Sequence, residues 1–266
     1  MRSIKELKDI GGKKVLVRVD WNEPVFEGEI SNDSRIRKSI PTIMLLLARG
    51  AKVILATHLE PKETPFDVFK KYVPPGAELL PNLRLDSGEE ANSADFAQSL
   101  AARADIYVNE AFSVSHRQHA SIVGVPKLLP AYAGLQFFRE VSMLSRSFYP
   151  PRPFFLILGG AKFETKLPLI QKFLPLADFI FIGGGMAKAA IGTPLADDPK
   201  VFFTVGDVAA IDANSETLEI LKEKIVASKF ILWNGPVGNY ENGHTYGTLG
   251  LAKILSKCGK EVIIGG

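Results

Sequence analysis

The chain has 266 residues, 46% of them hydrophobic, and a formal net charge of +3, which predicts a soluble globular protein with one large or two smaller domains. This charge gives no support for a nucleic-acid or membrane partner, and no apolar run approaches the roughly 18 residues of a membrane-spanning helix. The single cysteine, Cys258, excludes an intramolecular disulfide. Together with a chain start that lacks a signal-peptide pattern, it favours a cytoplasmic location.

Strand-like apolar runs and helix-like periodic segments alternate through the first half of the chain. The pattern predicts strands at 13–20, 51–56 and 105–112, a short element at 81–85, and helices at 36–47 and 93–104. A further helix is predicted at 134–148, and three prolines interrupt the chain between 150 and 153. We therefore expect a first domain at 1–148 and a second at 149–266.

The second half repeats this alternation, and glycines follow its apolar runs. The runs end at Gly159-Gly160, Gly183-Gly184-Gly185, Trp233-Asn234-Gly235-Pro236 and Gly265-Gly266, and the clearest helical segment between them is 215–227. Strands that alternate with helices predict an α/β protein with a parallel sheet in each half.

The segment 154–166 is the strongest local signal for a binding site. Five apolar residues predict a buried strand, Gly159 and Gly160 allow a sharp turn, and a helix follows. Lys162 and Lys166 would share one face of that helix, near an N-terminus that favours phosphate. A βα turn with two solvated lysines remains the alternative interpretation.

Polar residues occur where the predicted strands end, and in open parallel sheets ligands bind at that edge. In the first half these residues are Asp20, Asn22, His58, Arg84 and Asn109, with Arg117 just beyond. They suit a small phosphorylated acid, whereas the glycines and Lys162 of the second half suit a nucleotide. These two edges together predict a kinase that binds two substrates. Any one of these side chains could instead donate or accept a hydrogen bond within a loop.

Several motifs, in order along the chain, resemble those of the phosphoglycerate kinase family. They are Val15-Leu16-Val17-Arg18-Val19-Asp20-Trp21-Asn22-Glu23-Pro24, Asn82-Leu83-Arg84, Asn109-Glu110-Ala111-Phe112, His116-Arg117-Gln118-His119, Gly159-Gly160-Ala161-Lys162, Gly183-Gly184-Gly185-Met186 and Trp233-Asn234-Gly235-Pro236. The ordinary P-loop pattern and the protein-kinase motifs are absent from the sequence.

The resemblance implies two doubly wound, Rossmann-like parallel-sheet domains joined by a hinge helix at about 134–148. It implies a glycolytic phosphotransferase with a carboxyl group as acceptor, which moves phosphate reversibly from 1,3-bisphosphoglycerate to ADP with Mg²⁺. The family's phosphoglycerate contacts match Asp20, Asn22, Arg35, His58, Arg84 and Arg117. Its nucleotide contacts match Gly160, Ala161, Lys166, Gly184, Asn234, Pro236, Gly238 and Glu241, and its catalytic cations match Arg35, Lys162 and Lys166. A monomer is expected.

The sequence departs from the family pattern in four places. Glu60 stands near where an arginine is expected, and the segments 61–81 and 187–232 are shorter than usual. The chain also stops at Gly266, where the family continues with an acidic magnesium ligand, so the second domain is expected to be incomplete and the metal ligand is unknown. A non-catalytic nucleotide- or phosphate-binding relative is the alternative function.

Overall fold

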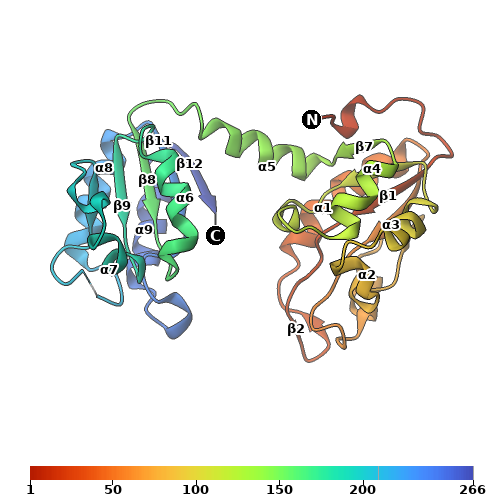
Figure 1. Cartoon of the computed structure of the whole chain (residues 1–266), viewed down its shortest axis with the longest axis horizontal. Helices are drawn as coiled ribbons and strands as arrows, with labels where there is room; N and C mark the ends of the chain where they lie inside the picture. The colour runs from red at the N-terminus through yellow and green to blue at the C-terminus, as the bar shows by residue number, and fades with distance from the viewer. Residues whose placement is uncertain (209, 266) are drawn as a thin grey trace. The chain divides into compact units, whose positions relative to one another are not determined.

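The computed structural model describes residues 1–208 and 210–265, which form two compact units. Unit 1 comprises Met1–Ser142 and unit 2 comprises residues 143–266, with the boundary inside helix α5 (Leu135–Arg146) (Figure 1). Within the described ranges, none of the helices is long and apolar enough to cross a membrane.

Unit 1 is built on a parallel five-stranded sheet with the order β5-β4-β1-β6-β7. Its strands are β1 (Lys14–Arg18), β4 (Lys52–Ala56), β5 (Ala77–Leu79), β6 (Ile106–Asn109) and β7 (Ala131–Ala133), and a small antiparallel pair is formed by β2 (Val25–Phe26) and β3 (Glu29–Ile30). Its helices are α1 (Ser34–Ala48), α2 (Ser87–Glu90), α3 (Ala94–Ala101), α4 (Val125–Leu128) and most of α5, with short helical turns η1 (Ile4–Glu6), η2 (Phe66–Tyr72), η3 (Leu83–Leu85), η4 (Phe112–Val114) and η5 (Ala120–Gly124).

Strand β1 is buried on both faces because helices cover both sides of this sheet. Val15 and Val17 pack in one apolar cluster with Ile36 of α1, whereas Leu16 packs in another with Leu100 of α3. This explains why β1 reads as a nearly continuous apolar run instead of an alternating one. The proline at position 41 lies within α1 without ending it.

Unit 2 has a parallel sheet of five strands with the order β10-β9-β8-β11-β12. The strands are β8 (Phe154–Leu158), β9 (Phe179–Ile182), β10 (Val201–Phe203), β11 (Phe230–Asn234) and β12 (Glu261–Gly265). The helices are α6 (Phe163–Phe173), α7 (Met186–Ile191), α8 (Ser215–Ala227) and α9 (Tyr246–Lys257), with the turns η6 (Pro194–Asp197) and η7 (Tyr240–Asn242).

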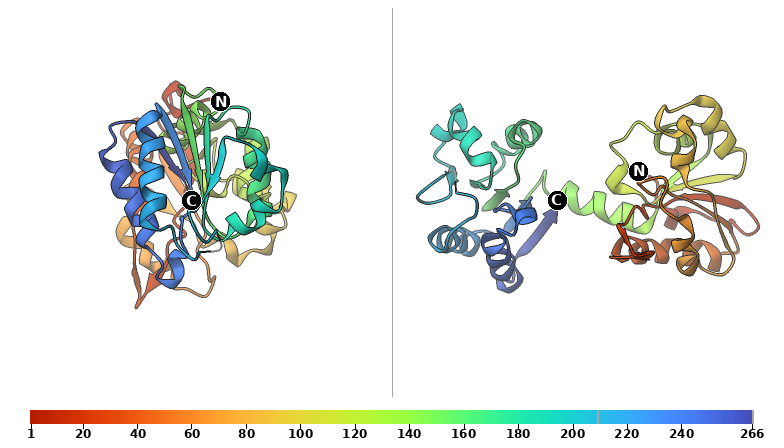
Figure 2. Two further views of the ribbon diagram at one scale, coloured as in Figure 1. Left: turned by 90° about the vertical axis from the view of Figure 1, so that its left-hand side faces the viewer. Right: turned by 90° about the horizontal axis from the view of Figure 1, so that it is seen from below.

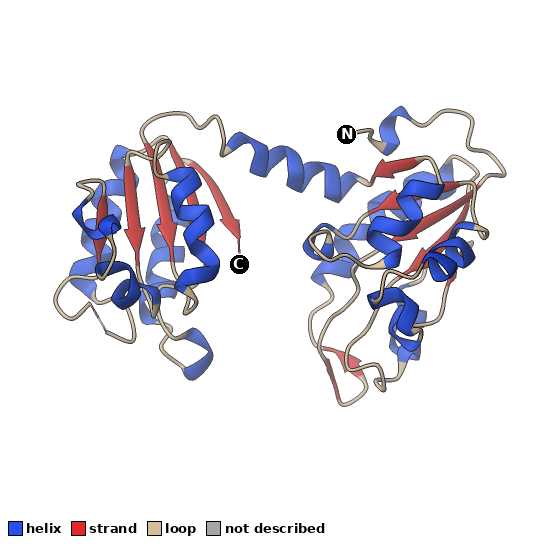
Figure 3. Ribbon diagram, viewed as in Figure 1, coloured by secondary structure: helices blue, strands red, loops and turns tan. Residues whose placement is uncertain are grey.

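Strand β8 lies at the centre of this second sheet, and all five of its residues are buried. Leu156 belongs to the apolar cluster that includes Ile170 of α6, whereas Ile157 belongs to the cluster that includes Leu221 of α8. Helices therefore cover both faces of the sheet, as the views in Figure 2 and the coloured elements in Figure 3 show.

The two sheets have the same topology. In each, the strand that comes first in the chain is central, the second and third extend to one side, and the fourth and fifth to the other. The strand order therefore reverses between β1 and β6 in unit 1, and between β8 and β11 in unit 2. In such sheets ligands bind at this reversal, outside the carboxyl ends of the strands. The predicted fold class, two doubly wound α/β domains, is confirmed.

Candidate functional site

Asp20 and Asn22, which follow β1, hold the guanidinium of Arg35 at the carboxyl edge of the first sheet. Arg35 Nη1 lies 3.3 Å from Asp20 Oδ2 and donates to the Asn22 carbonyl oxygen at 3.1 Å. Asp20 also accepts a hydrogen bond from the Ser113 hydroxyl. These contacts fix the position of the Arg35 side chain. Because that side chain remains 49% exposed, a ligand can still reach its guanidinium.

His58, which follows β4, is fully buried and presents a proton donor. Its Nδ1 lies 3.0 Å from Arg18 Nη2, and a guanidinium can only donate, so Nδ1 accepts. Burial, and secondarily Arg18, lowers the pKa of His58 to about 2, so the neutral ring carries its proton on Nε2. That Nε2 has no hydrogen-bond partner within residues 1–208 and 210–265.

Arg18 itself is held by a buried polar network beneath His58. Its Nε donates to Ser121 Oγ at 2.8 Å, and Ser121 donates from Oγ to Glu89 Oε1 at 2.6 Å and from its backbone N–H to Glu89 Oε2 at 2.9 Å. Burial lowers the pKa of Arg18, whereas the Glu89 carboxylate opposes that shift. Sequence reasoning missed Arg18 and Glu89 as site residues. The available signal was a charged side chain between Val17 and Val19 in an otherwise apolar strand.

Arg84, in η3, supplies a second buried donor. Its side chain is only 3% exposed, and its Nε donates to Glu60 Oε1 at 2.6 Å. Its Nη1 lies 3.3 Å from His119 Nδ1, whereas its Nη2 has no partner in the part of the chain that the structure describes. Arg117 Nη1 lies 4.0 Å from the same Glu60 oxygen, and the charges of Arg84 and Arg117 both act on the pKa of His58. Side chains from three strand ends thus gather here.

Asn109, at the end of β6, orders the local backbone, and within residues 1–208 and 210–265 its side chain makes no hydrogen bond to this cluster. Its Oδ1 accepts from the Ala111 N–H at 2.9 Å and so shapes the turn after the strand. The next residue, Glu110, accepts from the backbone N–H groups of Gln136 at 3.1 Å and Phe137 at 3.0 Å. The carboxylate of Glu110 therefore caps the first turn of α5.

The carboxyl edge of the second sheet is formed by backbone packed on backbone. The Gly160 N–H donates to the Pro236 carbonyl at 2.8 Å, and a Cβ at Gly159 would overlap that same oxygen. Gly235 has φ +84° and lies so close to Gly159 that it has no room for a side chain either. Gly184, with φ +64°, packs against Gly160. The predicted positions Gly160, Gly184 and Pro236 are thus brought together.

The two lysines of this edge have different environments. Lys162 is exposed at the N-cap of α6. Lys166 is partly buried, which lowers its pKa, and its ammonium donates to Asn234 Oδ1 at the end of β11. Because α6 follows β8, this contact bridges the two strands at which the order of the sheet reverses. Lys166 and Asn234 therefore meet where a ligand is expected.

The other predicted nucleotide positions are more scattered. Ala161 is exposed beside Lys162, and Glu241 is exposed in η7. Gly238 is buried, and a Cβ there would overlap the Asp212 carboxylate.

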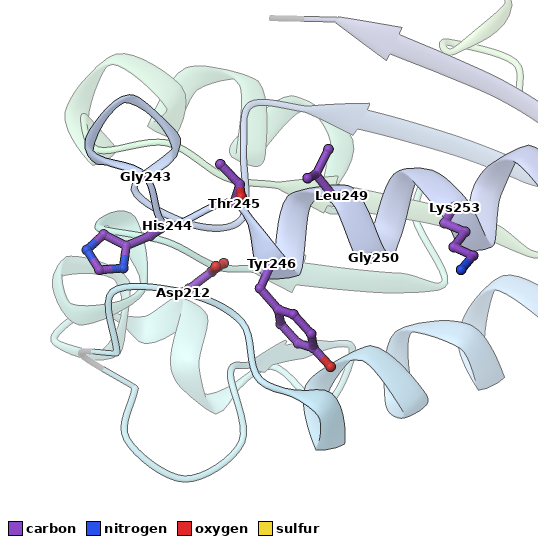
Figure 4. Close-up of a pocket in the computed structure, with 8 residues that line it drawn as sticks. All are labelled: Asp212, Gly243, His244, Thr245, Tyr246, Leu249, Gly250 and Lys253. Atoms are coloured by element: carbon purple, nitrogen blue, oxygen red, sulfur yellow. The ribbon is translucent and has the colours of Figure 1, made fainter.

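A cavity of about 600 Å³ lies beside that region (Figure 4), lined by Asp212, Gly243, His244, Thr245, Tyr246, Leu249, Gly250 and Lys253. Sequence reasoning named none of these residues, because no motif marks them. Asp212 accepts from the Gly247 N–H at 3.1 Å and thereby caps α9, so its carboxylate is already engaged. The cavity contains none of the predicted nucleotide contacts and therefore does not coincide with the strand-end edge.

The described residues contain no group of three or more His, Cys, Asp or Glu side chains that could hold a metal ion. The described side chains therefore do not form a site that would coordinate magnesium through protein ligands alone. They are compatible with the common arrangement in which Mg²⁺ arrives with a nucleotide and keeps phosphate and water ligands.

Comparison with protein families gives a match over nearly the whole chain. The family model described as phosphoglycerate kinase matches residues 4–78, 69–193 and 200–266. The first two matched ranges overlap at 69–78, and a gap at 194–199 separates the second from the third. The overlap and the gap fall inside the segments 61–81 and 187–232, which are shorter than the family pattern.

Curated relatives match at similar length. The phosphoglycerate kinase of Thermomicrobium roseum is 32% identical over 348 aligned residues, which cover 100% of this chain and 88% of the relative. That of Desulforudis audaxviator is 34% identical over 340, covering 97% and 86%. Because both alignments are longer than 266 residues, these relatives contain internal residues without a counterpart here.

Two solved structures resemble the chain throughout. The phosphoglycerate kinase of Coxiella burnetii aligns with a TM-score of 0.83 and 26% identity, covering 99% of this chain and 88% of that one. The enzyme of Pyrococcus horikoshii aligns with a TM-score of 0.85 at 22% identity, covering 100% and 89%, and supports the fold.

Proposed function

Because the chain belongs to the phosphoglycerate kinase family, we propose that it transfers a phosphoryl group reversibly from 1,3-bisphosphoglycerate to ADP, giving 3-phosphoglycerate and ATP. The observation that carries this proposal is the pair of buried donors in unit 1, His58 Nε2 and Arg84 Nη2, which lack protein partners among the described residues. Buried donors without partners are costly, and a bound anion would satisfy both.

Unit 1 is the proposed site for the phosphorylated acid. His58 and Arg84 donate to its phosphate, and Arg117, whose side chain is 34% exposed, adds a partly exposed positive charge. Arg35, oriented by Asp20 and Asn22, is left for the carboxyl end of the same molecule. Charge-assisted hydrogen bonds from guanidinium groups are strong and directional, so they would fix the orientation of a small acid.

Unit 2 is the proposed site for the nucleotide. Its glycine-lined edge lets the polyphosphate approach the backbone, and Lys162 and Lys166 neutralise charge there. During transfer the bond between the carboxyl oxygen and phosphorus breaks, and a bond from the terminal ADP oxygen to phosphorus forms. A carboxylate leaves readily without a strong acid, so the main requirement is positive charge around the transferring oxygens.

Lys166 is the proposed stabiliser of that group, together with Arg35 and Lys162. Its hydrogen bond to Asn234 fixes the position of an otherwise flexible side chain, and its partial burial strengthens its interaction with an anion. Magnesium would be held mainly by the nucleotide phosphates and would neutralise part of their charge. A cytoplasmic location, a monomeric state, and the division at 148 with a hinge helix at 134–148 belong to the same proposal.

The direct test is a coupled assay with the purified chain, 3-phosphoglycerate, ATP and Mg²⁺, in which formation of ADP and of the acyl phosphate is followed. We expect turnover that requires all three components and is lost in Arg84→Met. Binding of both substrates without turnover would contradict the enzymatic proposal and would instead identify a non-catalytic relative.

A further inference from the structure

The carboxylate of Glu60 lies on the anion-binding arginines of unit 1. Its Oε1 accepts from Arg84 Nε at 2.6 Å and lies 4.0 Å from Arg117 Nη1. The backbone N–H of Glu60 donates to Asn22 Oδ1 at 2.9 Å, so the segment that carries this carboxylate is fixed to the site. The bond to Arg84 lowers the pKa of Glu60, so the group is charged at neutral pH.

The hydrogen bond to Glu60 uses only one of the two donors on that side of the Arg84 guanidinium. The Nε–H and one N–H of Nη2 form a parallel pair of donors that a carboxylate or phosphate can accept together. Arg152 and Asp178 show the filled arrangement in the same chain, because Arg152 donates to Asp178 from both Nε and Nη2. At Arg84, Glu60 takes Nε, whereas Nη2 is buried without a partner among residues 1–208 and 210–265.

We propose that Glu60 is an internal competitor for the anion site, and that a ligand phosphate must displace its carboxylate from Arg84 in order to bind. A phosphate has enough oxygens to accept from Arg84 Nε, Arg84 Nη2 and His58 Nε2, which one carboxylate oxygen cannot satisfy. The side chain of Glu60 is 42% exposed, so the displaced carboxylate has direct access to solvent. Phosphate binding is therefore an exchange of one anion for another. The affinity for phosphate depends on how strongly the Glu60 carboxylate holds Arg84, as well as on the arginines themselves.

A second carboxylate, that of Glu90, also lies near Arg84 but interacts with it more weakly than Glu60 does. Glu90 Oε1 lies 3.6 Å from Arg84 Nε, beyond hydrogen-bond distance, and its side chain is 58% exposed. It opposes a phosphate through its charge alone, so its removal should have a smaller effect than removal of Glu60. Glu63 is an exposed glutamate of the same loop as Glu60 and gives a variant with the same change in net charge.

The test is calorimetric titration of the full chain and of Glu60→Gln, Glu90→Gln and Glu63→Gln with inorganic phosphate and with 3-phosphoglycerate. We expect about tenfold tighter binding in Glu60→Gln, a smaller gain in Glu90→Gln, and a change within about twofold in Glu63→Gln. Thermal unfolding of each variant checks that the fold is retained.

The two probes separate this inference from the proposed function on which its natural ligand rests. If Glu60→Gln binds inorganic phosphate more tightly but no variant binds 3-phosphoglycerate, the competitor role stands and the assigned substrate is wrong. If Glu60→Gln binds both probes no more tightly than the unmodified chain, or if phosphate binds to none of the proteins, the competitor role is overturned.

Discussion

The two sheets of this chain share one strand order but present opposite kinds of chemistry at their carboxyl edges. In unit 1 the edge consists of charged side chains that rest on a buried network of Arg18, Ser121 and Glu89. In unit 2 the edge is largely backbone, with Gly159 and Gly235 packed too closely for any side chain, and its two lysines lie in α6 and at the N-cap of that helix. A shared topology therefore decides where a ligand binds, whereas the residues at the strand ends decide what is bound.

This difference also predicts which kind of substitution destabilises each edge. An edge made of buried charges is damaged when a charge is removed, because its partner stays buried without compensation. An edge made of close backbone is damaged when a single methyl group is added, because the neighbouring strands would have to separate.

The largest expected effect on stability is that of Arg18→Met. It leaves Glu89 buried without a countercharge and His58 Nδ1 without a donor, so we expect the free energy of unfolding to fall by about 3–5 kcal/mol. Denaturant titration measures this loss. Arg37→Met, which removes an exposed arginine paired with Asp33, is the matched control and should change the midpoint little. Equal effects of the two substitutions would show that the buried network has no special role.

Lys166→Met tests the catalytic role that we propose for unit 2. Loss of one positive charge at the transferring group should lower kcat by about 10²–10³-fold while the fold is retained. Lys188→Met, in the exposed part of α7, is the control and should retain nearly full turnover in the coupled assay. Near-normal kcat in Lys166→Met would remove this residue from the mechanism.

His58 should make unit 1 sensitive to acid. Because its pKa falls from 6.5 to about 2 on folding, the unfolded chain takes up the proton first as pH decreases. Its contribution to stability is therefore present above about pH 6.5 and is lost at about 1.4 kcal/mol per pH unit as pH falls toward 2.

Urea unfolding of the unmodified chain and of His58→Gln between pH 8 and pH 4.5 measures this slope. At pH 8 the difference in the free energy of unfolding between the two proteins measures the contacts that the His58 ring makes. The change in that difference as the pH is lowered measures the effect of His58 protonation. A difference that stays constant with pH would contradict the assignment of a buried neutral ring.

Gly159→Ala is the smallest of the four effects and tests the backbone edge. The added methyl group would meet the Pro236 carbonyl, so we expect a loss of about 1–3 kcal/mol in the free energy of unfolding. Gly192→Ala is the control, because the nearest atom to a Cβ there is 3.8 Å away. If the two substitutions have equal effects, the backbone around Gly159 is packed less tightly than the overlap with the Pro236 carbonyl implies.

The alternating fold could be predicted because apolar runs and glycines mark it locally. The strand at 154–158 appears as β8 with the same bounds, and the helix at 215–227 appears as α8. The strand predicted at 105–112 is shorter, ending at Asn109, because Glu110 turns away to cap α5. The helix predicted at 93–104 likewise narrows to Ala94–Ala101.

The site was predicted less completely because its key pairings join distant positions. Arg18 and Ser121 are 103 residues apart, and nothing local in the sequence links them. The sequence showed that Glu60 stands near where an arginine is expected, but it gave no sign that Glu60 accepts a hydrogen bond from Arg84. The residues around the cavity near Tyr246 carry no motif, so only the folded chain identifies them.

The central place of β8 has a consequence for the order in which the protein can be synthesised and folded. Phe154–Leu158 pairs with Phe230–Asn234 on one side, roughly 70 residues later in the chain. At about 5–20 residues per second, a ribosome needs about 4–15 seconds to supply that partner. Until then five consecutive apolar residues have an unpaired edge, which is the kind of segment that recruits other strands. Nascent chains stalled shortly before Phe230 should therefore bind chaperones that recognise extended apolar peptides, and chains stalled well after Asn234 should not.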